Sequence, residues 1–82
     1  TLNKYVGNYL LSGITVKVYI KNEKLYLFVE GQPEYELAAV DKNMYVLTIL
    51  EGFKAEFIEN PDGTIKEMKM HQPNGIFTAV KK

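Results

Sequence analysis

The sequence predicts an all-β domain, an antiparallel meander of about eight short strands that curls into a small barrel or half-barrel. Three observations predict it. Apolar residues recur with a period of two along most of the chain, turn-forming residues separate these runs about every 8–12 residues, and no long stretch has helical periodicity. The 82 residues are enough for one small domain, residues 1–82, without a linker or repeat.

The stretch from Ile14 to Glu30 is the clearest element, because two alternating runs flank a two-residue polar turn, Asn22-Glu23. Successive side chains leave a strand on opposite faces, so this pattern predicts a β-hairpin. We expect Asn22 to adopt a positive φ. The apolar face of the hairpin consists of Ile14, Val16, Val18, Ile20, Leu25, Leu27 and Val29.

The other elements follow from the turn signals. A helical turn over residues 2–6 should end at Gly7, and further strands are expected near residues 9–11, 35–39, 44–50, 53–57, 64–72 and 76–80. The run Met44–Leu50 is nearly continuous in apolar residues, which predicts a strand that is covered on both faces or lines an interface.

The last hairpins carry two more local signals. Asn60–Gly63 has the residue types of a type I turn followed by a left-handed glycine. In the next strand Ile65 is out of phase with Met68 and Met70, which predicts a β-bulge near Lys66-Glu67.

Composition excludes several classes of function. Ten basic and ten acidic residues give a net charge of zero, so the basic surface of a nucleic-acid-binding protein is missing. The absence of cysteine excludes thiolate metal sites and a cysteine nucleophile. No apolar run is long enough for membrane insertion. Because the chain begins at Thr1, we expect an excised domain or an accessory module of a longer protein.

The sequence predicts no catalytic residues, no metal site and no cofactor. Ser12 and His71 are the only serine and histidine, and neither lies in a nucleophile motif. Glu59 and Asp62 lack the spacing of a calcium loop. Glu30, Glu34 and Glu36 form a carboxylate cluster, but such clusters usually belong to solvated turns.

Aromatic residues on the second face of the sheet indicate a partner or ligand surface. Tyr19, Tyr26 and Phe28 should point away from the apolar face of the hairpin, and Tyr45 adds an aromatic side chain in the fifth strand. Cross-strand aromatic pairing, or burial under the N-terminal segment, would explain the same pattern without a partner.

The inward side chains define a second hypothesis, a cavity for one small apolar ligand inside the barrel. The predicted lining consists of Val16, Val18, Leu27, Leu37, Phe57, Met68 and Met70.

Several short motifs, in order along the chain, resemble one family. Tyr5–Tyr9 is similar to its opening Y-x-G-x-Y signature, and Gly31-Gln32-Pro33, Ala55-Glu56-Phe57, Asp62-Gly63 and Met70–Gly75 follow in matching order. The order resembles the lipocalin-like β-domain of unknown function at the C-terminus of bacterial serine β-lactamase-like and penicillin-binding-protein-like proteins.

This resemblance implies a lipocalin-like barrel in a bacterial accessory domain, with a periplasmic or extracellular location. It carries over no catalytic residues, because the serine, lysine and tyrosine of those hydrolases belong to a separate domain.

Three functions are therefore compared. The first is a non-catalytic interaction domain that docks on a neighbouring catalytic domain, or on a second copy if a sheet edge stays open. The second is a carrier of a small apolar ligand. The third, an independent enzyme, has the least support from the residues.

Overall fold

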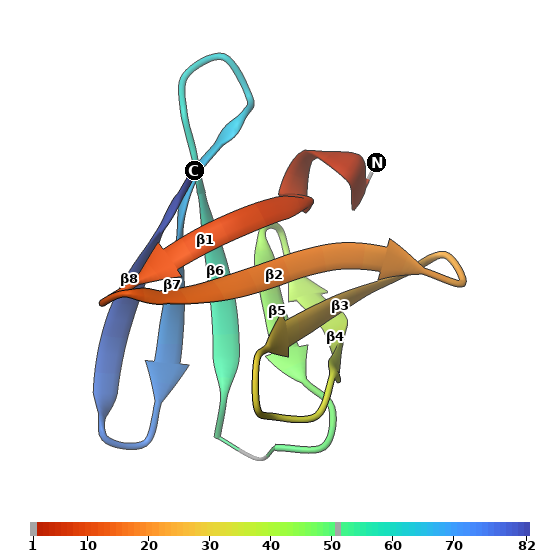
Figure 1. The fold of residues 1–82 in the computed structure, drawn as a ribbon. Helices are drawn as coiled ribbons and strands as arrows, with labels where there is room; N and C mark the ends of the chain where they lie inside the picture. The colour runs from red at the N-terminus through yellow and green to blue at the C-terminus, as the bar shows by residue number, and fades with distance from the viewer. Residues whose placement is uncertain (1, 51) are drawn as a thin grey trace.

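A computed structural model of the protein describes residues 2–50 and 52–82. A short 3₁₀-helix is followed by eight strands: η1 (Leu2–Tyr5), β1 (Gly7–Leu11), β2 (Ile14–Lys21), β3 (Lys24–Val29), β4 (Tyr35–Asp41), β5 (Met44–Leu47), β6 (Lys54–Glu59), β7 (Ile65–Gln72) and β8 (Gly75–Lys81). Each strand pairs antiparallel with the next, and β8 pairs with β1, so the sheet is a closed barrel (Figure 1). The predicted all-β meander is confirmed, and closure excludes the half-barrel.

The hairpin of β2 and β3 has the predicted register. Lys21 pairs with Lys24 across the turn, and both Asn22 (φ 53°) and Glu23 (φ 66°) adopt a positive φ. Two consecutive positive φ values are typical of the type I′ turn, whose twist matches that of the strands. The positive φ predicted for Asn22 is therefore confirmed and extends to Glu23.

The turn predicted at Asn60–Gly63 and the bulge predicted near Lys66-Glu67 are also confirmed. In the β6–β7 turn the Gly63 amide donates to the Asn60 carbonyl at 3.0 Å, and Gly63 has a φ of 91°. In the ladder, Ile58 pairs with Glu67 while the adjacent Glu59 pairs with Ile65. The unpaired Lys66 is the extra residue of a bulge, which lets Ile65, Met68 and Met70 all face the core.

The fifth strand is shorter than predicted. It ends at Leu47, and the chain then turns, with the Leu50 amide donating to the Leu47 carbonyl at 3.2 Å. Ile49 is consequently 69% exposed. The apolar run therefore does not indicate a strand that reaches Leu50, and the part after Leu47 belongs to a loop at one end of the barrel.

The core fills the barrel interior and includes residues from η1 and every strand. Its members are Tyr5, Tyr9, Val16, Val18, Leu25, Leu27, Leu37, Tyr45, Leu47, Ala55, Phe57, Ile65, Met68, Met70 and Ala79. The strand ends extend past it, because Ile14 and Ile20, predicted on the apolar face, are 50% and 36% exposed. An eight-stranded barrel encloses little more volume than its own side chains occupy.

The seam between β1 and β8 closes the barrel through a short ladder. Tyr9 pairs with Lys81 and Leu10 with Val80, and the Lys82 amide donates to the Asn8 carbonyl at 2.9 Å. Gly7 precedes this ladder with a φ of 155°, and a Cβ atom there would lie 2.9 Å from Cε of Lys81. Glycine at this position therefore leaves room for the Lys81 side chain to cross the start of β1.

Candidate functional site

The outer face of β2 and β3 carries three of the aromatic residues predicted as a partner surface. Tyr19 pairs with Tyr26 across the two strands, and Phe28 pairs with Lys17. Their neighbours along each strand point into the core, so these aromatic side chains point outward, and all three are partly exposed. We call Tyr19, Tyr26 and Phe28 the outer aromatic surface.

Glu34, from the segment between β3 and β4, holds one end of this surface. The two tyrosine rings are stacked, with centroids 6.1 Å apart. The Glu34 carboxylate accepts hydrogen bonds from the Tyr19 hydroxyl and the Lys21 ammonium, and Lys21 Nζ lies 4.8 Å from the centroid of the Tyr26 ring. These contacts fix the two tyrosines in place, as cross-strand pairing alone would not.

These contacts, together with desolvation, shift the pKa values of Tyr19 and Glu34. Desolvation, followed by the hydrogen bond to Glu34, raises the pKa of the Tyr19 hydroxyl to about 12. The hydrogen bond from Lys21, followed by that from Tyr19, lowers the pKa of Glu34 below its usual value. Glu34 is therefore ionised and Tyr19 protonated at neutral pH.

Two shallow depressions lie beside Phe28 on the outside of the barrel. One has a volume of about 600 Å³ and the other about 430 Å³, and Lys17 and Phe28 contribute to both. The larger one also includes Tyr19 and Glu34. Phe28 is therefore a partly exposed ridge between two open hollows.

The structure corrects the placement of Tyr45. This side chain is only 6% exposed and lies in the core, where its ring packs edge-on against Tyr5 and Phe57 with centroids 5.3 and 5.7 Å away. Burial, followed by the proximity of Tyr5, raises its pKa to about 12. Tyr45 is therefore unavailable to a partner on the outside of the barrel.

Tyr45 belongs to a closed end of the barrel, where η1 lies across the strand ends (Figure 1). Tyr5 of η1 packs on Phe57 with ring centroids 4.5 Å apart, and the Tyr9 hydroxyl donates to the Tyr5 carbonyl at 2.8 Å. Tyr5 and Tyr9 are the first and last residues of the Y-x-G-x-Y motif, so that motif has a structural role.

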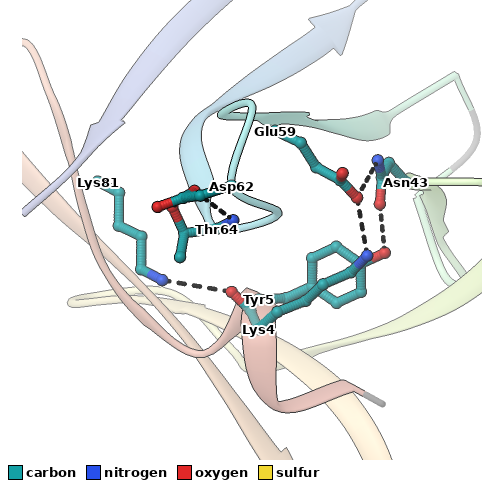
Figure 2. Close-up of polar contacts among 7 residues, drawn as sticks. All are labelled: Lys4, Tyr5, Asn43, Glu59, Asp62, Thr64 and Lys81. Atoms are coloured by element: carbon teal, nitrogen blue, oxygen red, sulfur yellow. Dashed lines mark hydrogen bonds and ion pairs between the residues drawn. The ribbon is translucent and has the colours of Figure 1, made fainter.

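A polar network surrounds this closed end (Figure 2). The Glu59 carboxylate accepts from Lys4 Nζ at 2.8 Å and from Asn43 Nδ2 at 2.9 Å, while the Asn43 carbonyl oxygen accepts from the Tyr5 hydroxyl. Lys81 Nζ donates to the Lys4 carbonyl at 3.3 Å. Sequence reasoning missed this network, because its members come from η1, the β4–β5 turn, β6 and β8.

The seven residues predicted to line a ligand cavity all lie in the core, and each is at most 6% exposed: Val16, Val18, Leu27, Leu37, Phe57, Met68 and Met70. They pack with one another and with the other buried residues. The direction in which they point was predicted correctly, but they fill the space that a ligand would need.

A smaller hollow of about 150 Å³ opens at the end of the barrel opposite η1, and we call it the mouth pocket. Buried lining residues are Val16, Leu27, Leu47 and Met70, and half-buried apolar ones include Leu50 and Phe53. Its polar lining residues are Gln32, Tyr35 and Gln72. One signal of this site is present in the sequence, because the apolar run continues past Leu47 to Leu50, which lines the pocket.

His71 and Asp62 both have local partners. His71 Nε2 lies 2.9 Å from Glu56 Oε1, and the Asp62 carboxylate accepts from the Thr64 amide and hydroxyl at 3.0 and 2.6 Å. Those bonds lower the pKa of Asp62. Over residues 2–50 and 52–82, no group of three or more acidic, histidine or cysteine side chains is placed to hold a metal ion.

The part of the chain that the structure describes contains no helix with the length and apolarity needed to span a membrane. A family model described as a domain of unknown function, DUF3471, matches residues 1–81, so the chain belongs to this family. No curated protein matches the chain.

Proposed function

We propose that this DUF3471 domain is a non-catalytic accessory module that docks, through the outer aromatic surface, on the catalytic domain of a serine-hydrolase-type protein. The observation that carries the proposal is Phe28, a partly exposed aromatic ridge between two depressions on a rigid sheet. Aromatic side chains of this kind are enriched at protein interfaces and often contribute most of the binding energy.

The fixed positions of the two tyrosines support the same function. Glu34 and Lys21 already order Tyr19 and Tyr26 in the free domain. A preorganised surface loses little side-chain entropy on binding, so more of the contact energy remains as affinity. The resemblance to the lipocalin-like domain of β-lactamase-like proteins supplies the class of partner, and the closed eight-stranded barrel is compatible with that resemblance.

The chain's own polar groups support a non-catalytic role. Ser12 is exposed in the β1–β2 turn with a φ of 47°, and the partner of His71 is Glu56. Hydrolytic catalysis by serine needs a base within hydrogen-bond reach of the hydroxyl. The hydrolytic residues are accordingly assigned to the neighbouring domain.

A carrier with its ligand deep in the barrel is less well supported. The residues that would line its cavity pack in one core, and the mouth pocket includes only Val16, Leu27 and Met70 of the seven. Ligand cavities of ordinary size, roughly 300–1,000 Å³, are larger than the mouth pocket.

Photo-crosslinking tests the docking surface. A benzophenone amino acid replaces Phe28 in the intact hydrolase that contains the domain, and the same amino acid replaces Ile76 on β8 as a control that is 60% exposed. We expect crosslinks from position 28 to peptides of the catalytic domain and none from position 76.

Two results would contradict the proposal. Equal crosslinking from both positions would indicate non-specific proximity, and crosslinks from position 76 alone would place the interface on β8. In addition, Phe28→Ser should reduce crosslinking from a probe at Tyr19 while the melting temperature of the isolated domain stays within a few degrees.

A further inference from the structure

The mouth pocket is separate from the proposed docking surface, since none of Tyr19, Tyr26 and Phe28 lines it. Its deepest lining residues include Leu27, Leu47 and Met70, which belong to the core. The pocket is therefore a local extension of the core toward solvent at the end that η1 does not cover.

The lining determines which charge a ligand can carry. The polar side chains among the described lining residues are Gln32, Tyr35 and Gln72, and none of them is a carboxylate, an ammonium, a guanidinium or an imidazole group. A charged group that entered would lose its hydration without meeting an opposite charge in this lining, which is strongly unfavourable. The two amides can each donate and accept hydrogen bonds, so they suit one neutral polar group.

The volume determines how large the ligand is. A dry apolar cavity of about 150 Å³ accommodates a molecule the size of benzene. The mouth pocket has the same volume, about 150 Å³. One aromatic ring, or a short branched alkyl group, therefore fills it.

Backbone hydrogen bonds hold several lining residues at the mouth. The Gln32 amide donates to the Val29 carbonyl at 3.0 Å, and the Leu47 amide donates to the Phe53 carbonyl at 3.3 Å. These bonds place lining side chains next to buried strand residues. Lining residues that are held in this way lose little further conformational entropy when a ligand binds.

We infer that the mouth pocket is a binding site for a small uncharged amphiphile, such as a phenol or a short branched alcohol. The apolar part packs against the buried lining residues Leu27, Leu47 and Met70, and the single polar group remains near Gln32 and Gln72. This inference does not depend on the docking function, because none of the three residues of the outer aromatic surface lines the pocket.

Methyl NMR of the 82-residue chain tests this assignment, with phenol as the probe and benzoate as its charged counterpart. We expect saturable phenol-induced shifts of the Leu27, Leu47 and Met70 methyl signals at millimolar concentrations. Benzoate should bind at least about tenfold more weakly, because its carboxylate must be desolvated at the mouth.

Two matched variants locate the site. Val29→Phe enlarges a half-buried lining residue and should weaken phenol binding at least about tenfold. Val40→Phe makes the same change at a position that is 57% exposed near the closed end, and it should leave the affinity within about twofold. If Val29→Phe does not fold, Leu11→Trp replaces it, because Leu11 lines the mouth pocket, is half-buried and lines neither depression beside Phe28.

Three results would overturn the inference: no saturable shift with phenol, equal affinity for benzoate, or unchanged binding in the folded mouth variant. Failure of this test would leave the crosslinking result at position 28 unaffected, and the reverse also holds.

Discussion

The two ends of the barrel differ in how they are built. At the closed end Tyr5, Tyr9 and Tyr45 surround Phe57, and hydrogen bonds join Lys4, Asn43 and Glu59 across segments far apart in sequence. At the mouth, apolar side chains meet around an unfilled hollow. Side-chain hydrogen bonds and aromatic packing join the segments at the closed end, whereas apolar contacts and backbone hydrogen bonds form the mouth. Stability should therefore reside mainly at the closed end, while the mouth keeps room for a ligand.

Truncation of one aromatic residue at each end makes this comparison quantitative. Tyr5→Ala removes a buried ring and its hydroxyl contact, so we expect a loss of about 3–5 kcal/mol in the free energy of unfolding. Phe53→Ala removes a half-buried ring at the mouth and should cost about 1–2 kcal/mol. Urea denaturation of both variants checks the order. Equal losses would mean that the two ends contribute alike.

Substitution of one glycine by alanine at each end of the barrel gives a second pair of variants to compare. Gly7→Ala forces a Cβ atom against Lys81 at an unfavourable φ, and it disturbs the contact of Lys81 with the Lys4 carbonyl. We expect a loss of about 2 kcal/mol. Gly31→Ala, near the mouth, also places alanine at a positive φ, 88°, but with open space around the added methyl, so a loss of about 1 kcal/mol is expected. Thermal melts of the two variants should show the larger shift for Gly7→Ala.

Acid should affect the closed end more than the mouth. The hydrogen bond from Lys4, followed by that from Asn43, lowers the pKa of Glu59. A lowered folded-state pKa gives stability that is present above the unfolded value, 4.5, and is lost as the pH falls through the folded value. Glu59→Gln should therefore melt below the parent at pH 7 and converge with it near pH 2.

The pH dependence of phenol binding at the mouth can be compared with the pH dependence of stability that Glu59 confers at the closed end. The described lining residues of the mouth pocket include no acidic side chain, so the phenol affinity should stay constant with pH while the domain remains folded.

The Glu59→Gln prediction has its own contrary outcome. If the difference in melting temperature between Glu59→Gln and the parent stayed the same at low pH, the carboxylate charge would contribute nothing to stability.

The smallest effect is expected for exposed apolar residues near the mouth. Ile49→Ser changes a side chain that is 69% exposed in the loop after β5, and stability should remain within about 0.5 kcal/mol. A larger loss in urea denaturation would mean that this loop is part of the cooperative core.

Sequence reasoning succeeded where a local pattern determines a local structure. Alternation placed Tyr19, Tyr26 and Phe28 outside the barrel, and the phase change at Ile65 predicted the bulge at Lys66. These features depend on neighbours in the chain and on the period of a strand.

It failed where the structure depends on closure of the sheet. In the continuous apolar run Met44–Leu50 neither face is marked as polar, so the sequence could not show that Tyr45 points inward or that the strand ends at Leu47. The mouth pocket combines residues from six strands and the loops between them. Only the closed barrel brings these residues together, and no spacing in the sequence encodes that.

The seam between β1 and β8 has a mechanical consequence. Both chain ends leave from the same end of this antiparallel ladder, where Lys82 bonds to Asn8 and the pairs Tyr9–Lys81 and Leu10–Val80 follow. A force that separates the two chain ends must first pull η1, with Tyr5, away from the core. It would then break the ladder bonds one after another instead of loading them all at once in shear. A tether attached at both ends should therefore release η1 first and next expose the inner side of β1.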